Sequence, residues 1–156
     1  MAKIKGKPTA MVRRVVILSI LLLFFSVPHT LEDFATGEPG KAGIPAPVLS
    51  LVVATVLALQ ALGLYWLGQK QRRGFSVHVG VGLFWPVASG VAQLPTILSG
   101  VPYRSGFISV LYVGGILVIG VLLLVFSLAA LLQTRASGTG TNLQPSMGPC
   151  SWKASV

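Results

Sequence analysis

The chain has 156 residues, of which 53% are apolar and only 10% are charged. Soluble domains carry roughly 25% charged residues, so this composition argues against a water-soluble enzyme. The high apolar content also excludes a chain that is mainly disordered. The formal net charge is +9, but the basic residues punctuate long apolar runs instead of forming one cluster. That distribution is typical of membrane proteins and argues against nucleic acid as a partner.

Four apolar stretches are each long enough to cross a bilayer, which takes about 20 residues per helix. They cover residues 11–30, 47–68, 75–98 and 106–132. Two of the connections, QKQRR and SGVPYRS, are short, so neighbouring helices are expected to run antiparallel. The sequence therefore predicts an all-α integral membrane protein, an antiparallel four-helix transmembrane bundle over residues 11–133.

The two ends of the chain are predicted to lie outside this bundle. Residues 1–10 form a short basic segment, and residues 134–156 are rich in Ser, Thr, Gly and Pro. Such a composition buries too little apolar surface to offset the entropy of ordering, so we expect a flexible polar tail. The first apolar stretch also has the basic start and apolar core of a signal peptide, but no small-x-small cleavage site follows it, which favours a retained helix.

The charges predict an orientation in the membrane. If the chain crosses four times, ten Lys and Arg fall on one side, and only Lys41 and Arg104 fall on the other. The three acidic residues lie in or beside the first loop of that second side. By the positive-inside rule, we expect a multi-pass protein of the cell (cytoplasmic or plasma) membrane with both termini in the cytoplasm.

Small and polar residues repeat at helical spacing on three of the stretches, and such residues usually face the interior of a membrane bundle. Gln60, within the second stretch, is expected to donate a hydrogen bond between helices. Pro86 is expected to kink the third stretch. The stripes are Ser50, Ala54, Ala61, Tyr65 and Gly68 with Ala58 beside them; His78, Gly82, Trp85, Ser89, Gln93 and Thr96; and Gly106, Ser109, Val113, Gly120 and Ser127.

The segment PHTLEDF, residues 28–34, offers the best candidates for acid–base chemistry. If the first helix continues through it, His29, Glu32 and Asp33 share one face, near the outer edge of the hydrocarbon core. Such groups serve as general acids or bases. Alternatively, Pro28 ends the helix and Thr30 caps a short interfacial helix, which leaves the acids in water.

A ligand pocket on the same outer side is predicted from the third stretch and the turn that follows it. Arg104 is placed to pair with an acid of the first loop, and polar residues of the third stretch are placed to line the pocket. The expected pocket residues are Trp85, Ser89, Gln93, Thr96 and Arg104.

No strong catalytic, cofactor or metal motif occurs in the chain. The sequence has no phosphate-binding glycine loop, no HExxH, no paired CxxC and no G-x-S-x-G. Its one cysteine, Cys150, allows no intramolecular disulfide. His29 and His78 are expected about 15 Å or more apart in depth, too far to share one metal ion. We therefore expect no cofactor and no metal.

These observations favour a non-enzymatic function. The first hypothesis is an accessory subunit or a binder of a hydrophobic ligand, in contact with the bilayer and with another membrane protein or a second copy of the chain. The second hypothesis is a membrane-embedded enzyme for a lipid-like substrate, with His29, Glu32 and Asp33 as acid–base groups. The third is a small transporter or proton channel, which needs polar side chains through the full depth of the membrane.

Overall fold

The computed structural model describes residues 10–100 and 105–139, and this part of the chain is all-helical. Four of its helices are long and apolar enough to cross a membrane, so the chain has the architecture of a small multi-pass membrane protein. The fifth is a single short turn between the first two long helices. In chain order the helices are α1 (Ala10–Ala35), α2 (Glu38–Lys41), α3 (Ala46–Gly68), α4 (Arg73–Leu98) and α5 (Phe107–Thr139).

Helix α1 runs without interruption through Pro28 and ends at Ala35, so the interpretation that Pro28 ends the helix is wrong. Thr30 does not act as a cap, because its hydroxyl donates to the carbonyl oxygen of Ser26, one turn earlier in the same helix, at 2.7 Å. Proline is tolerated inside membrane helices where neighbouring groups satisfy the backbone around it. The continuation of α1 carries the acidic segment on the helix and not in a loop.

Helix α5 extends to Thr139, beyond the predicted end at residue 132. The added residues include Gln133 and Arg135, which have good intrinsic helix propensity. Among the residues after 132, the first glycine is Gly138. Residues 140–156 of the predicted tail lie outside the described residues.

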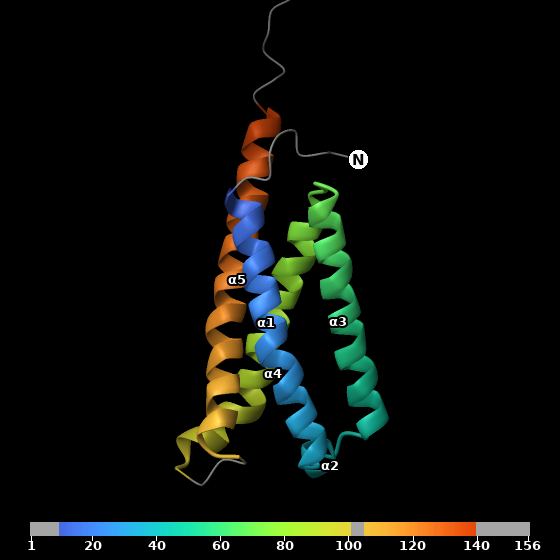
Figure 1. Cartoon of the computed structure of the whole chain (residues 1–156), viewed down its shortest axis with the longest axis vertical. Helices are drawn as coiled ribbons and strands as arrows, with labels where there is room; N and C mark the ends of the chain where they lie inside the picture. The colour runs from blue at the N-terminus through green and yellow to red at the C-terminus, as the bar shows by residue number, and fades with distance from the viewer. Residues whose placement is uncertain (1–9, 101–104, 140–156) are drawn as a thin grey trace, which may run out of the picture.

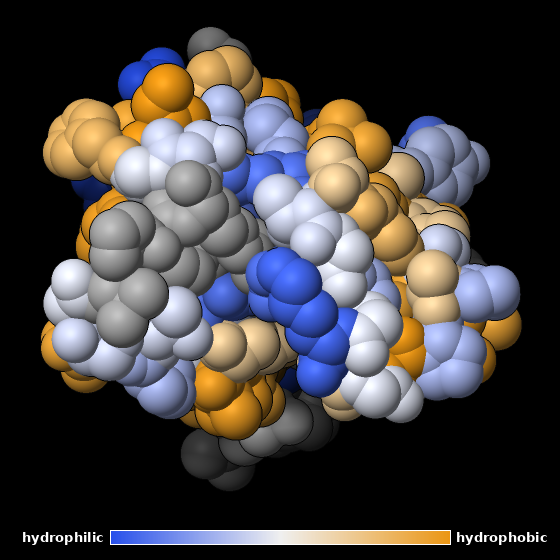
Figure 2. All heavy atoms as spheres, turned by 90° about the horizontal axis from the view of Figure 1, so that it is seen from below, coloured by the Kyte–Doolittle hydropathy of each residue, from blue (hydrophilic) through white to orange (hydrophobic). Residues whose placement is uncertain are grey.

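Helices α1, α4 and α5 form the centre of the bundle, and α3 stands at its edge (Figure 1). The link from α1 to α3, with α2, lies at one end, and the link from α3 to α4 lies at the opposite end (Figure 1). The apolar core comes mainly from α1, α4 and α5; α3 adds only Leu67 to the fully buried apolar residues. Its main members are Val15, Leu22, Phe75, Val81, Trp85, Ile116 and Leu123. Seen from the end where α1 finishes, strongly polar residues gather near the middle, and the most apolar residues lie farther out, among less apolar ones (Figure 2).

Two glycines bring α4 and α5 into close contact. A Cβ atom on Gly82 would lie 2.7 Å from the backbone nitrogen of Leu124 in α5. A Cβ atom on Gly120 would lie 2.7 Å from Cδ of Pro86 in α4. Small residues at helix contacts allow this backbone approach, which provides the van der Waals packing that holds helices together in lipid.

The predicted inward faces are confirmed for α4 and α5, with one exception each. On α4 the stripe from His78 to Gln93 is buried, but Thr96 is exposed. On α5 the exception is Gly106, which is exposed just before the helix and has a φ of 72°. The buried members of the two stripes are His78, Gly82, Trp85, Ser89 and Gln93 on α4, and Ser109, Val113, Gly120 and Ser127 on α5.

The predicted inward face of α3 is wrong. The residues predicted for that face are all exposed. The buried residues of α3 are instead Gln60, Gly63 and Leu67. Ser50 needs no partner in the bundle, because its hydroxyl donates to the carbonyl oxygen of Ala46 at 2.9 Å. The amide of Gln60 finds its partners on another helix, and this requirement sets the rotation of α3. The exposed stripe consists of Ser50, Ala54, Ala58, Ala61, Tyr65 and Gly68.

Candidate functional site

The predicted acid–base residues lie on the last turns of α1. Because the helix continues through Pro28, His29, Glu32 and Asp33 are presented by one helix. The imidazole of His29 is buried, and its Nε2 lies 3.7 Å from Oδ2 of Asp33, one turn later. Asp33 keeps partial contact with solvent, with 19% of its side chain exposed. A carboxylate beside an imidazole can hold or transfer a proton.

Glu32 joins α1 to α5. The hydroxyl of Ser109, near the start of α5, donates a hydrogen bond to Oε1 of Glu32. The same hydroxyl oxygen accepts a hydrogen bond from the backbone N–H of Ser105 at 3.2 Å. Glu32 is half-buried, so one carboxylate both faces the bundle and ties the end of α1 to the beginning of α5. The sequence did not indicate this contact between Glu32 and Ser109.

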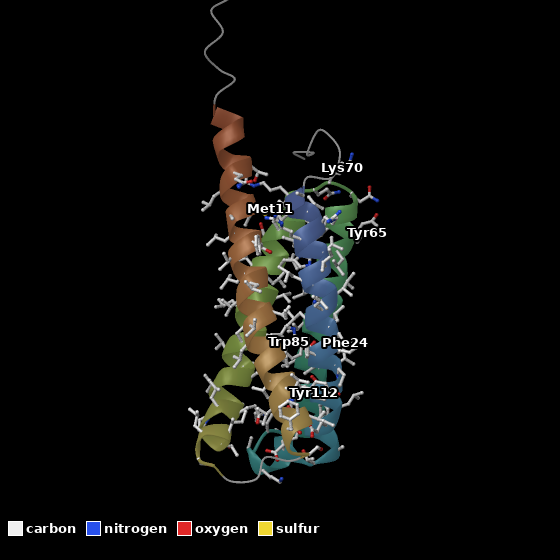
Figure 3. All side chains as sticks on the ribbon, turned by 60° about the vertical axis from the view of Figure 1, so that its left-hand side comes forward. Met11, Phe24, Tyr65, Lys70, Trp85 and Tyr112 are labelled. Carbon is white, nitrogen blue, oxygen red and sulfur yellow. The ribbon has the colours of Figure 1, made fainter. Side chains whose placement is uncertain are left out.

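The predicted pocket residues are only partly brought together. Trp85, Ser89 and Gln93 are buried on one face of α4, whereas Thr96 is exposed. Trp85 lies about midway along the bundle (Figure 3). Its indole Nε1 is buried and has no hydrogen-bond partner among the described residues. Arg104 lies outside the described residues.

A second polar cluster, the Ser19–Gln60–His78 network, joins three helices. Its three side chains, from α1, α3 and α4, are 0% exposed. The amide nitrogen Nε2 of Gln60 donates to the carbonyl oxygen of Ser19 at 2.9 Å and to its Oγ at 3.0 Å. The Nε2 atom of His78 lies 3.0 Å from Ser19 Oγ, and its Nδ1 lies 2.7 Å from the carbonyl oxygen of Gly74. The prediction that Gln60 donates between helices is therefore confirmed.

The partners of the network fix the direction of each hydrogen bond. A carbonyl oxygen only accepts, so Nδ1 of His78 carries a proton and donates it to Gly74. In the neutral imidazole, Nε2 then has a free lone pair and accepts the hydroxyl proton of Ser19. Ser19 Oγ accepts in turn from Gln60. Every contact is thus a proper donor–acceptor pair when His78 is uncharged.

Ser19 was not among the residues predicted from the sequence. Its signal is the inward stripe of α1, in which Val15, Ser19, Leu22, Ser26 and His29 follow one another at steps of four and three residues. Ser19 and Ser26 are the two polar residues of the long apolar run in the first stretch. A polar residue on the inward stripe of a membrane helix predicts a partner on another helix.

The two histidines lie at different levels of the bundle. Ser19 is bonded to His78, and His29 follows Ser19 by ten residues on α1, about 15 Å of helical rise. Within residues 10–100 and 105–139, no three His, Cys, Asp or Glu side chains gather as they would around a metal ion.

No protein-family model matches this chain, and comparisons with curated proteins and with solved structures likewise find no match.

Proposed function

We propose that this multi-pass membrane protein is an accessory subunit, and that it binds a transmembrane helix of another membrane protein through the outer face of α3. This face is the exposed stripe of small residues defined above. One observation carries the proposal: α3 turns the stripe that contains Ala54, Ala58 and Ala61 away from its own bundle, and it contacts that bundle through another face, with Gln60, Gly63 and Leu67.

The chemistry of this face suits a helix better than lipid. Small residues let two backbones approach closely, and they are enriched where membrane helices meet. Large apolar side chains that lipid tails cover well are exposed elsewhere on the bundle, for example Val91 and Leu98 on α4, which are 76% and 79% exposed. The small members of the α3 stripe, Ala54, Ala58 and Ala61, recur at steps of four and three, which is the spacing of a helix contact.

Site-specific crosslinking tests the proposed contact. Cys150 is the one cysteine of the chain, so Cys150→Ser gives a cysteine-free background. A cysteine-reactive photocrosslinker on Ala54→Cys, Ala58→Cys or Ala61→Cys should capture the same stoichiometric membrane protein in native membranes. The matched control is Val91→Cys, which is likewise exposed, lies on α4 and is expected to capture none. Capture from all four positions alike, capture from none, or a crosslink to a second copy of this chain would each contradict an accessory-subunit role.

We further propose that the helices alternate in direction across the cell membrane, with both termini in the cytoplasm. The charge distribution supports this orientation. Arg13 and Arg14 lie near the start of α1, and Lys70, Arg72 and Arg73 lie at or beside the link from α3 to α4; these segments share one end of the bundle (Figure 1). The acidic residues lie toward the other end, on α1 and α2. A basic end of this kind is retained on the cytoplasmic side.

The single cysteine provides a direct test of this orientation. A membrane-impermeant maleimide should leave Cys150 unlabelled in intact cells and label it once the membrane is permeabilised. The matched control places the cysteine in the link between α1 and α3, as Ala42→Cys in the Cys150→Ser background, because Ala42 is exposed. This control should be labelled in intact cells. Labelling of Cys150 without permeabilisation would overturn the proposed orientation.

A further inference from the structure

We infer that Ser19 and His78 form a nucleophile–base pair that hydrolyses an acyl ester of an anionic membrane lipid, and that α3 covers this pair. The inference goes beyond the accessory-subunit role and rests on the Ser19–Gln60–His78 network, not on the outer face of α3.

The geometry of the pair is that of an activated serine. A serine nucleophile needs a base within about 2.6–3.2 Å of its oxygen and a third group that orients the base. His78 Nε2 lies 3.0 Å from Ser19 Oγ, and the carbonyl oxygen of Gly74 holds His78 Nδ1–H at 2.7 Å. In the network described above, the hydroxyl proton of Ser19 points toward the lone pair of His78 Nε2, as a general base requires. Ser26 and Ser127 are equally buried on α1 and α5, but their hydroxyl oxygens have no hydrogen-bond partner among the described residues.

Glycines bring α3 over the imidazole. A Cβ atom on Gly63 of α3 would lie 2.7 Å from Cε1 of His78. A Cβ atom on Gly74 of α4 would lie 2.8 Å from the carbonyl oxygen of Gly63. The two backbones therefore meet beside His78, and α3 shields the pair from the lipid phase.

Helix α3 is the least embedded of the four long helices. Only Gln60, Gly63 and Leu67 of α3 are buried, and none of residues 46–59 is. A substrate is expected to enter from the side where residues 46–59 move away from the bundle, while Gln60 stays beside Ser19 and Gly63 stays over the imidazole of His78.

The position of the pair points to the substrate class. Ser19 follows Arg14 by five residues and His78 follows Arg73 by five, so each lies about 7.5 Å below an arginine along its helix. Arg14 and Arg73 are both exposed. An anionic lipid headgroup held by these arginines would place its acyl ester carbonyl, which lies just below the phosphate, near the level of Ser19.

The chemistry balances without any cofactor. Ser19 Oγ bonds to the carbonyl carbon as its proton passes to His78 Nε2, and the ester C–O bond then breaks as the leaving alkoxide takes that proton. Water next attacks the acyl-serine, gives one proton to His78, and releases the carboxylic acid while the proton returns to Ser19 Oγ. Gln60 Nε2 lies 3.0 Å from Ser19 Oγ, so it is placed to donate to an oxyanion that forms beside that atom.

A long-chain alkyl fluorophosphonate tests the inference on the full-length protein. It reacts with activated serines by forming an O–P bond and releasing fluoride. We expect one adduct on the wild-type chain, located at Ser19 by mass spectrometry. Ser19→Ala should abolish labelling, and His78→Gln should slow it by about 100-fold or more. Ser26→Ala is the matched control and should leave labelling unchanged.

A second readout addresses the substrate. Protein reconstituted in vesicles of phosphatidylglycerol and phosphatidylcholine should release fatty acid from phosphatidylglycerol preferentially, and the Ser19→Ala variant should release none. Absence of any adduct on the wild-type chain, or an adduct at another residue, would overturn the nucleophile. Equal release from the two lipids would overturn the role of the arginines.

Discussion

Gly82→Ala is expected to destabilise the bundle by about 1–3 kcal/mol, the usual cost of overpacking. For a chain of this length, that corresponds to a melting temperature about 2–12 °C lower, measured by the helical circular dichroism signal in detergent. The reason is geometric. The new methyl group would lie 2.7 Å from the backbone nitrogen of Leu124 and 3.0 Å from the carbonyl oxygen of Gly120. Backbone atoms cannot turn aside as a flexible side chain does, so α4 and α5 must separate locally.

The matched control is Gly80→Ala, two residues earlier on the same helix, where a Cβ atom would meet nothing within 4 Å. Gly114→Ala provides the same control on α5, again with open space around the added atom. Alanine is the better helix former by roughly 0.5–1 kcal/mol, so both controls should be neutral or slightly stabilising. An equal loss of stability at Gly80 and Gly82 would show that the cost arises within α4 and not at its contact with α5.

The sequence predicted the spanning helices because their signal, long apolar runs between polar links, is local and strong. It also predicted which faces of α4 and α5 are buried, because the polar residues within the apolar run of each helix fall mainly on one stripe. On α4, for example, His78, Trp85 and Gln93 all mark the same side.

It failed on α3 because that helix carries two competing signals. The stripe through Ala54, Ala58 and Ala61 is small and suits a helix contact, whereas Gln60 is polar and needs a hydrogen-bond partner. The polar requirement decides the rotation, since an amide in lipid loses more than a methyl group does. Which signal dominates depends on whether a partner exists on a neighbouring helix, and that partner is Ser19.

The acidic segment shows the limit of reading a helix end from the sequence. Pro28 and Thr30 together resemble a helix end followed by a new cap, yet α1 continues past both. The carboxylate of Glu32 finds a donor on α5, in the hydroxyl of Ser109, which is 77 residues away in the chain. A contact at that separation supports the helical conformation here and has no local signature.

The Ser19–Gln60–His78 network yields the second large stability effect, and its direction depends on which partner is removed. Ser19→Ala is expected to cost about 1–3 kcal/mol, because it leaves the buried Nε2 of His78 without its hydroxyl donor. Gln60→Leu is expected to cost under about 1 kcal/mol, because Ser19 Oγ keeps its hydrogen bond to His78 when the amide is lost. That change also removes Oε1, which has no hydrogen-bond partner among the described residues. The same thermal unfolding measurement in detergent compares the two variants.

A double variant separates this account from a simple loss of packing. Replacing both partners of a buried hydrogen bond by apolar groups leaves no polar atom unsatisfied, so Ser19→Ala combined with His78→Leu should recover much of the stability lost in Ser19→Ala alone. If the structure instead needs the imidazole only for its volume, the two losses should add. If Gln60→Leu costs as much as Ser19→Ala, the stability lost in Ser19→Ala arises from the bond between Ser19 and Gln60. It then does not arise from the bond between Ser19 and His78. The order of the three stabilities therefore tests the proton positions assigned to this network.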